Sequence, residues 1–152
     1  MQKDVPIVSV AAFEPWTVEQ FFAWQESQAE RYELVNGVPL KMTVGARNVH
    51  DDIVVNVLTA LKARLRDTGC TPFTGDGRVE TRPGQIRRPD VGVDCGPCDP
   101  AGTKAALPRL IVEVLSPSTR DFDTFGKLSE YKLMASLETI VVVEPNSPQV
   151  IL

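Results

Sequence analysis

The stretch RLIVEVLSPST, residues 109–119, decides the fold, because its strand-forming part has apolar side chains on both faces. A second stretch of the same kind, ETIVVVEP, occupies residues 138–145, and about 20 residues with a helical pattern lie between the two. This spacing requires a crossover, so we expect strands 110–115 and 139–144 to be parallel, with a right-handed connection. Glu113 lies within the first strand, where a buried carboxylate is costly unless something pairs with it.

Two helices and a hairpin are expected before this crossover. Thr17 begins a helix with a capping-box pattern, and Asn36-Gly37 between two apolar-rich runs is a strong hairpin signal. The longest predicted helix starts at Asn48 as its cap and ends at Gly69. The N-terminal half therefore supplies helices that can cover a sheet.

The rest of the chain completes a mixed sheet. Residues 77–96 predict two strands joined near Pro83 and Gly84, the second with clear two-residue alternation. The crossover helix is expected to run through about residue 136, and the chain ends in the first residues of another strand. This order predicts an α/β or α+β architecture with a mixed central sheet flanked by helices, and residues 1–152 suit a single domain.

Composition limits the function classes. The hydrophobic fraction of 43% and charged fraction of 24% are ordinary for a globular protein, and no apolar run reaches the length of a membrane helix. The N-terminus lacks the pattern of a signal peptide, so we expect a cytoplasmic protein. The net charge of −4 does not favour nucleic-acid binding. However, residues 62–109 hold nine Lys and Arg against six acids, so a local basic surface competes with an ordinary mixed one.

The cysteines point to no particular chemistry. Cys70, Cys95 and Cys98 are an odd number, which argues against a disulfide framework. Cys95 and Cys98 form a CxxC pattern, but a loop follows it where a thiol redox motif needs a helix. One CxxC is also weak evidence for zinc. We expect these cysteines to be small residues at the end of a strand.

Two acids lie in otherwise apolar strands, Asp90 and Glu113. If their strands are neighbours, the two carboxylates approach each other and cannot both stay ionised cheaply. A divalent cation such as Mg²⁺ resolves this conflict, because it takes carboxylate oxygens as ligands. Lys127, on the next helix, is better placed to assist than Lys132, which lies on a different helix face. The alternative is that the two acids form salt bridges with nearby arginines: Arg87, Arg88 or Arg109.

Four motifs together carry a family resemblance: YELVNG at 32–37, Pro89-Asp90, EVLSPST at 113–119, and Lys127 with Tyr131. In this order they resemble the PD-(D/E)XK nuclease superfamily and, within it, the family of restriction endonucleases called Uma, or Uma-two. The resemblance covers roughly residues 16–145. It implies a restriction-endonuclease-like core. Members of that family continue beyond the point where this chain stops, so it also implies a truncated chain or a sheet edge that a partner completes.

The resemblance further implies a metal site. Asp90, Glu113 and Val114 are assigned to Mg²⁺ or Mn²⁺. The wider superfamily has a lysine two residues after the second acid, where this chain has Leu115, so the lysine role moves to Lys127. Two further residues join the catalytic set as candidates: Glu33, as an outer ligand or water orienter, and His50, as a phosphate ligand or proton carrier. Their alternatives are an exposed hairpin glutamate and a packing or capping histidine.

The leading hypothesis is a metal-dependent endonuclease that hydrolyses DNA and acts as a homodimer, with no membrane partner. The candidates for contacts with the nucleic-acid backbone are Arg64, Arg66, Arg78, Arg82, Arg87 and Arg88. The second hypothesis is a non-catalytic, dimeric module that binds nucleic acid or protein on a nuclease scaffold. The acid pair with Lys127 favours the enzyme, whereas the negative net charge and the missing strand lysine favour the module.

Overall fold

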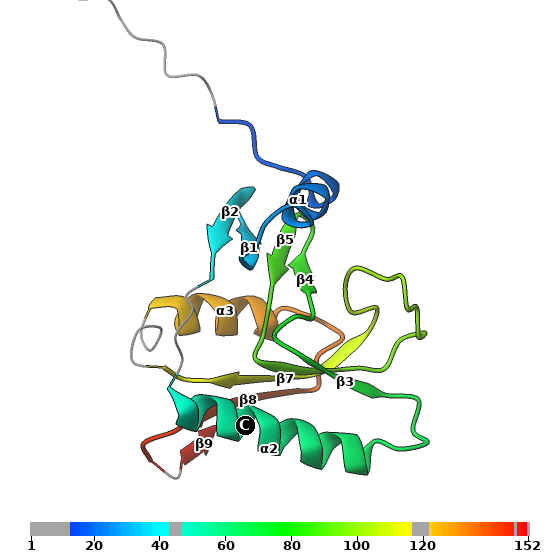
Figure 1. Ribbon diagram of the computed structural model, residues 1–152, viewed down its shortest axis with the longest axis vertical. Coiled ribbons are helices and arrows are strands. Elements are labelled where there is room, and N and C mark those ends of the chain that lie inside the picture. The colour runs from blue at the N-terminus through cyan, green and yellow to red at the C-terminus, as the bar shows by residue number, and fades with distance from the viewer. Residues whose placement is uncertain (1–12, 43–46, 117–121, 148, 152) are drawn as a thin grey trace, which may run out of the picture.

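The computed structural model describes residues 13–42, 47–116, 122–147 and 149–151 (Figure 1). It has a mixed α+β fold, with strands in two sheets. The helices are α1 (Val18–Gln25), α2 (Asn48–Arg64) and α3 (Phe122–Lys132). The strands are β1 (Tyr32–Val35), β2 (Val38–Lys41), β3 (Thr71–Thr74), β4 (Val79–Arg82), β5 (Gln85–Arg87), β6 (Val91–Asp94), β7 (Pro108–Val114), β8 (Thr139–Glu144) and β9 (Gln149–Ile151). None of these helices has the length and apolar character of a membrane span.

The larger sheet has the strand order β3-β6-β7-β8-β9. Strands β7 and β8 are parallel and are connected through α3, as the two apolar runs predicted. The other neighbours in this sheet are antiparallel. Val91 of β6 pairs with Val112 of β7, so β6, which begins directly after Asp90, is the neighbour of β7, which carries Glu113.

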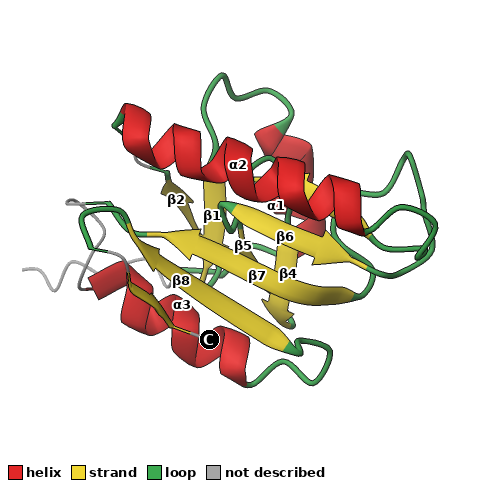
Figure 2. Ribbon diagram, turned by 90° about the horizontal axis from the view of Figure 1, so that it is seen from below, coloured by secondary structure: helices red, strands yellow, loops and turns green. Residues whose placement is uncertain are grey.

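Helices α2 and α3 cover opposite faces of this sheet (Figure 2). On the α2 side, Val91, Val112 and Val114 form a buried cluster against the apolar face of that helix. On the α3 side, Ile111 packs with Tyr131. Alternation along β7 therefore sends Ile111 and Glu113 toward α3, while their neighbours face α2.

A second, antiparallel sheet with the order β2-β1-β5-β4 stands above the first and carries α1 (Figure 1). The sequence predicted one central sheet, with a single strand running from about residue 85 to residue 95. That prediction was wrong: the chain leaves the smaller sheet after Arg87 and enters the larger one at Val91. Pro89 lies in this connection, where its missing N–H suits a break between strands. The fold class and the flanking helices are as expected.

Local predictions held better at turns than at helix ends. The Thr17 capping box forms, and the hairpin turn places Asn36 and Gly37 at positive φ. Helix α2, in contrast, has Arg47 at its cap position with no side-chain hydrogen bond, so Asn48 is not the cap. It also ends at Arg64, before Gly69 is reached, and α3 ends at Lys132, short of residue 136.

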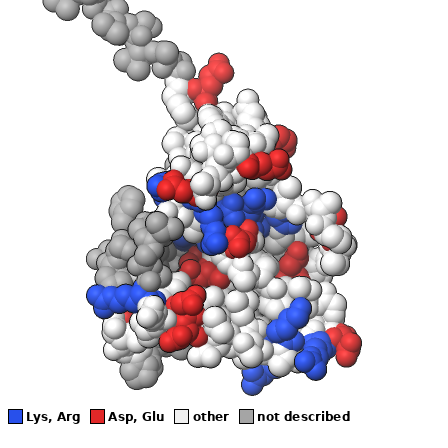
Figure 3. Space-filling model, viewed as in Figure 1, with Lys and Arg blue, Asp and Glu red and all other residues white. Residues whose placement is uncertain are grey.

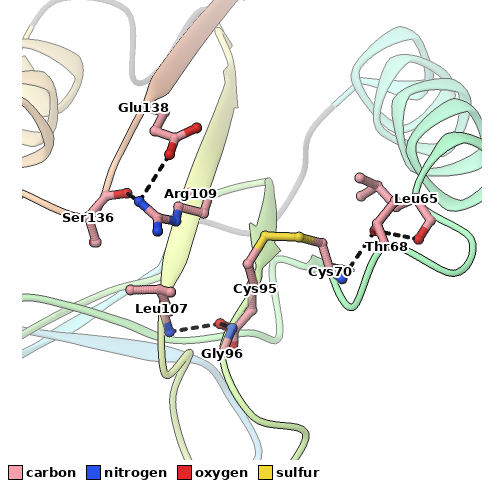
Figure 4. Close-up of a disulfide and its surroundings, with 10 residues drawn as sticks. Leu65, Thr68, Cys70, Cys95, Gly96, Leu107, Arg109, Ser136 and Glu138 are labelled. Atoms are coloured by element: carbon pink, nitrogen blue, oxygen red, sulfur yellow. Dashed lines mark hydrogen bonds and ion pairs between the residues drawn. A yellow bond between two sulfur atoms is a disulfide. The ribbon is translucent and has the colours of Figure 1, made fainter.

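A disulfide joins Cys70 to Cys95, although the odd cysteine count argued against a disulfide framework and small residues at a strand end were expected (Figure 4). The cause is the register of β3 against β6: Thr71 lies opposite Asp94, so the next residues outward, the two cysteines, are cross-strand neighbours with Cα atoms 4.1 Å apart. Cys98 is an exposed free thiol. The CxxC pattern is therefore not a paired redox motif.

Candidate functional site

The site lies where β6 begins and β7 ends. Because Val91 pairs with Val112, Asp90 lies beside Glu113 on the neighbouring strand. Burial first, and then the charge of Asp90 among others, raise the pKa of Glu113. The approach of the two acids predicted from the strand pattern is therefore present. The arginines that might have paired with them have other partners, described below.

Glu113 is held by a tyrosine. The Tyr131 hydroxyl, which is completely buried, donates a 2.7 Å hydrogen bond to Glu113 Oε1. Burial raises the pKa of Glu113 to about 8; the Lys127 ammonium opposes this shift, and the carboxylates of Asp90 and Glu33 add to it. Burial and the neighbouring Glu113 carboxylate together raise the pKa of Tyr131 well above 10. Near neutral pH, Glu113 therefore holds a proton unless another cation replaces it.

Asp90 is fixed from two sides. Its Oδ2 accepts a 2.7 Å hydrogen bond from the main-chain N–H of Val114. The same oxygen lies 3.4 Å from Nε2 of His50, whose side chain is 16% exposed. His50 sits in the first turn of α2 and thus brings that helix to the site. The histidine reaches Asp90, which is the position that a role in the site requires.

Lys127 and Glu33 form the second half of the site. Lys127 Nζ lies 3.2 Å from Glu33 Oε1, and both side chains are nearly inaccessible, at 10% and 4% exposure. The alternative that Glu33 is an exposed hairpin residue is therefore wrong. Lys132, in contrast, is exposed at the end of α3. Of the two lysines, Lys127 is therefore the one whose side chain lies at the site, and its catalytic role stays a prediction.

The Glu33 carboxylate is surrounded by donors. In addition to Lys127, it accepts a 2.8 Å hydrogen bond from the Arg88 main-chain N–H and a 3.1 Å hydrogen bond from Nη1 of Arg87. Arg87 also donates two hydrogen bonds to the Glu130 carboxylate, from Nε at 2.9 Å and from Nη2 at 2.6 Å. Burial opposes ionisation of both partners, yet the contacts between them hold the pKa of Glu130 below and that of Arg87 above its usual value.

Side chains on one face of α3 contact residues of three strands. Lys127, Glu130 and Tyr131 are spaced three and four residues apart, so they lie on the same side of the helix. Their partners are Glu33 on β1, Arg87 on β5 and Glu113 on β7. This helix face therefore links the smaller sheet to the larger one at the site.

Arg87 and Arg88 are not placed to contact a nucleic-acid backbone. Both are nearly fully buried, at 5% and 4% exposure. The Arg88 guanidinium donates to the main-chain oxygens of Tyr32 and Asp76, and burial together with the charge of Arg78 lowers its pKa to about 10. Both arginines therefore bind partners inside the protein. Neither forms the salt bridge to Asp90 or Glu113 that was the alternative to a metal site.

The other proposed backbone contacts lie nearer the surface. Arg78 is half-buried, with its guanidinium 4.9 Å from the centre of the Phe22 ring. Arg82 is exposed and donates a 2.7 Å hydrogen bond to Oδ1 of Asn36. Arg109, the third arginine considered as a salt-bridge partner of Asp90 or Glu113, pairs with Glu138 at 3.0 Å. Lys and Arg side chains also gather over the C-terminal end of α2 (Figure 3), where Lys62, Arg64 and Arg66 are exposed.

The donor set fits a hard divalent cation. Two carboxylates from neighbouring strands supply oxygen ligands, and Val114, beside Asp90, can offer only its main-chain carbonyl. Across the described parts of the chain, no three His, Cys, Asp or Glu side chains converge as a metal cluster. A cation here would thus depend on water or substrate oxygens for its other ligands, as Mg²⁺ commonly does.

The chain matches the family model Uma2, described as "Putative restriction endonuclease", over residues 18–152. This match covers every residue of the site. The chain belongs to this family. The resemblance seen in the four sequence motifs is therefore confirmed, although residues 117–119 of EVLSPST lie outside the described residues.

Two comparisons extend the Uma2 assignment. The "Uncharacterized protein slr1290" of Synechocystis sp. is 32% identical over 142 residues, which is 92% of this chain and 74% of that protein. A solved structure from Anabaena variabilis, of "a putative nuclease belonging to DUF820", has a TM-score of 0.69 and 17% identity, and the match covers 90% of this chain and 78% of that one. At this identity the structural likeness establishes the fold.

Sequence reasoning missed the residues that support the Uma2 site. Tyr131 was noted only as part of a motif, and Glu130 was not noticed, because nothing in a sequence marks which helical glutamate faces a buried arginine. Asp94, at the end of β6, accepts main-chain N–H groups of Gly96, Ala106 and Leu107 at 2.8–2.9 Å and so holds the loop before β7. The spacing of Glu130, three residues after Lys127, indicates a shared helix face but does not identify the arginine it contacts.

Proposed function

We propose that this Uma2 protein is a metal-dependent endonuclease that hydrolyses phosphodiester bonds of DNA. The observation that carries the proposal is the pair Asp90 and Glu113, held on neighbouring strands beside the buried Lys127. Proteins seldom leave two carboxylates facing each other in a partly buried position unless a cation joins them. The family description supports the restriction-type activity.

Asp90, Glu113 and the Val114 carbonyl would hold Mg²⁺ or Mn²⁺. When bound, such a cation supplies charge neutralisation at the scissile phosphate and a more acidic water. The chain's own residues arrange the remainder. Tyr131 fixes the Glu113 carboxylate, and the Val114 N–H fixes that of Asp90, so both are oriented before any ligand arrives.

Lys127, Glu33 and His50 supply the other chemical requirements of hydrolysis. Adding water across a P–O bond requires a charge-stabilising donor and proton transfer to and from oxygen atoms. The Lys127 ammonium stabilises charge on the phosphate or positions the attacking water. Glu33 orients that ammonium, and the His50 imidazole, 3.4 Å from Asp90, can carry a proton or bind phosphate.

The nucleic acid would contact surface cations, as its backbone affinity requires. Arg82 and the group Lys62, Arg64 and Arg66 are exposed, so they replace the buried arginines in this role. Cleavage of both strands of a duplex requires two sites, so we propose a homodimer with two-fold symmetry. The alternative is a non-catalytic dimeric module on the same scaffold, which the negative net charge favours.

Plasmid cleavage tests the enzyme against the module. The wild-type protein is incubated with supercoiled DNA and Mg²⁺ or Mn²⁺, with EDTA as the blank, beside the Asp90→Asn variant. Asp76→Asn, which alters an exposed acid paired with Arg31, is the matched control. We expect nicking or linearisation that EDTA and Asp90→Asn abolish and that Asp76→Asn retains. Binding of DNA without cleavage in any lane would favour the module.

A further inference from the structure

The Arg87–Glu130 pair lies one contact away from the candidate catalytic residues, and no role in the chemistry requires it directly. Lys127 has a flexible four-carbon stem, so its ammonium occupies one position only where the surroundings fix it. Glu33, at 3.2 Å, is one such fixing group. The position of Lys127 therefore depends on what holds the Glu33 carboxylate.

Arg87 holds Glu33 through the carboxylate oxygen that Lys127 does not contact. Its Nη1 donates to Glu33 Oε2, whereas Lys127 and the Arg88 N–H contact the other oxygen, Oε1. The two carboxylate oxygens thus have different tasks. Rotation of the carboxylate would break contacts to both, so Arg87 sets the orientation at which Oε1 meets Lys127.

Arg87 is in turn immobilised by Glu130. The guanidinium makes the two-point fork with Glu130 described above, which is the arrangement with the best-defined geometry among ion pairs. Glu130 also accepts hydrogen bonds from the Thr81 hydroxyl at 3.0 Å and from the Gln85 side-chain amide. Every link in the chain of contacts from Thr81 to Lys127 is thereby a hydrogen bond or an ion pair.

Stability alone is a poor explanation for this arrangement. Glu33, Lys127, Arg87 and Glu130 bring two positive and two negative charges into the interior, and desolvating such groups offsets most of their attraction. Apolar side chains would fill the same space at lower cost. What the charges provide, and apolar groups would not, is a defined place for one ammonium group.

We infer that Arg87 and Glu130 are positioning residues, which fix Glu33 and through it the Lys127 ammonium beside Asp90 and Glu113. This inference rests on the proposed function for its catalytic consequence, although the placement of Lys127 can be tested without it. The pair touches neither substrate nor metal, so its removal should loosen Lys127 while leaving metal binding intact.

The experiment compares Glu130→Gln and Arg87→Lys with the wild type. Thr81→Val is a milder change that removes one hydrogen bond to Glu130 and keeps the fold should the other variants fail to fold. Gln25→Ala is the matched control, because Gln25 is also a buried polar residue on the smaller-sheet side. Its partners are the main chains of Glu30 and Tyr32 and the Arg88 guanidinium, and not Arg87 or Glu130. The first readout is the NMR signal of the Lys127 ammonium, assigned by its loss in Lys127→Ala.

We expect a sharp, slowly exchanging ammonium signal in the wild type and in Gln25→Ala, broadened in Thr81→Val and lost in Glu130→Gln and Arg87→Lys. In plasmid cleavage, Glu130→Gln and Arg87→Lys should lower kcat at least tenfold, with KM and Mn²⁺ affinity within twofold. A wild-type Lys127 signal in Glu130→Gln would overturn the inference, and so would a kcat loss in Gln25→Ala of equal size. If no protein cleaves DNA, the proposed function fails, yet the ammonium signals still decide the positioning.

Discussion

The two carboxylate regions of the site differ in how their charge is balanced. On one side, Glu33 receives hydrogen bonds or ion pairs from Lys127, Arg87 and the Arg88 main chain. On the other, Asp90 and Glu113 lie beside each other across β6 and β7. Among the described residues, a tyrosine hydroxyl, a main-chain N–H and His50 contact them, and the Lys127 ammonium acts on Glu113 through its charge.

In one part of the site the charges are paired within the protein, and in the other they are not. The region around Glu33 pairs its charges within the protein and needs no further ion. At Asp90 and Glu113, burial and then the neighbouring carboxylates of Asp90 and Glu33 raise the pKa of Glu113 to about 8, against the opposing charge of Lys127. A partly buried acid pair of this kind is a place where a proton or a metal cation is taken up.

The region around Glu33, in which the charges are paired within the protein, is called the balanced region. The largest effect is expected from removing its anion, Glu33. Glu33→Ala leaves Arg87 and Lys127 buried without a shared partner, so we expect the unfolding free energy to fall by about 3–5 kcal/mol. Urea denaturation measures this change. The control is Glu30→Ala, which breaks an exposed pair with Lys41 and should cost less than about 1 kcal/mol. Equal losses in the two variants would contradict the comparison.

A smaller effect on stability is expected from a change of pH, which acts on Asp90 and Glu113, called the unbalanced region. The pKa of Glu113 is about 8 in the folded protein and near 4.5 when exposed, so its contribution to stability is fully present below pH 4.5 and is lost as pH rises through 8. With a chelator present, we expect the unfolding free energy to fall by about 2 kcal/mol between pH 5 and pH 9, less than the full shift implies because the side chain is partly exposed.

Glu113→Gln is the control for this pH dependence. The amide does not titrate, so its stability curve should be flatter than that of the wild type over the same range. A wild-type slope retained in Glu113→Gln would assign the pH dependence to another group.

The smallest effect is expected from the tyrosine that holds Glu113. Tyr131→Phe removes one hydrogen bond to a carboxyl group and should cost about 1 kcal/mol at pH 7. The loss should grow at pH 9, because Glu113 is then ionised and accepts a stronger hydrogen bond. Chemical denaturation at the two pH values distinguishes this result from a simple packing defect, for which the losses would be equal.

The unbalanced region was accessible from the sequence, and the balanced one largely was not. Asp90 and Glu113 stand out because they interrupt apolar strands, and the period of a strand indicates which residues share a face. Neighbouring strands then bring them together. Lys127 follows from the helix that comes next along the chain.

Contacts between the two sheets could not be predicted in the same way. The break between β5 and β6 sends Arg87 into one sheet and Asp90 toward the other, and no periodicity marks such a change of sheet. Arg87 and Arg88 therefore looked like surface cations, although burial gives them internal partners. The Cys70–Cys95 disulfide depends on the same kind of information, because it requires the register of β3 against β6.

Titration calorimetry of Mn²⁺ into the protein at pH 8 tests the central claim most directly. The wild type should bind one Mn²⁺ per chain, whereas Asp90→Asn and Glu113→Gln should show no binding at the same concentrations. Asp76→Asn, with its exposed acid, should bind as the wild type does. Unchanged Mn²⁺ binding in both site variants would contradict the assignment of the metal to this acid pair.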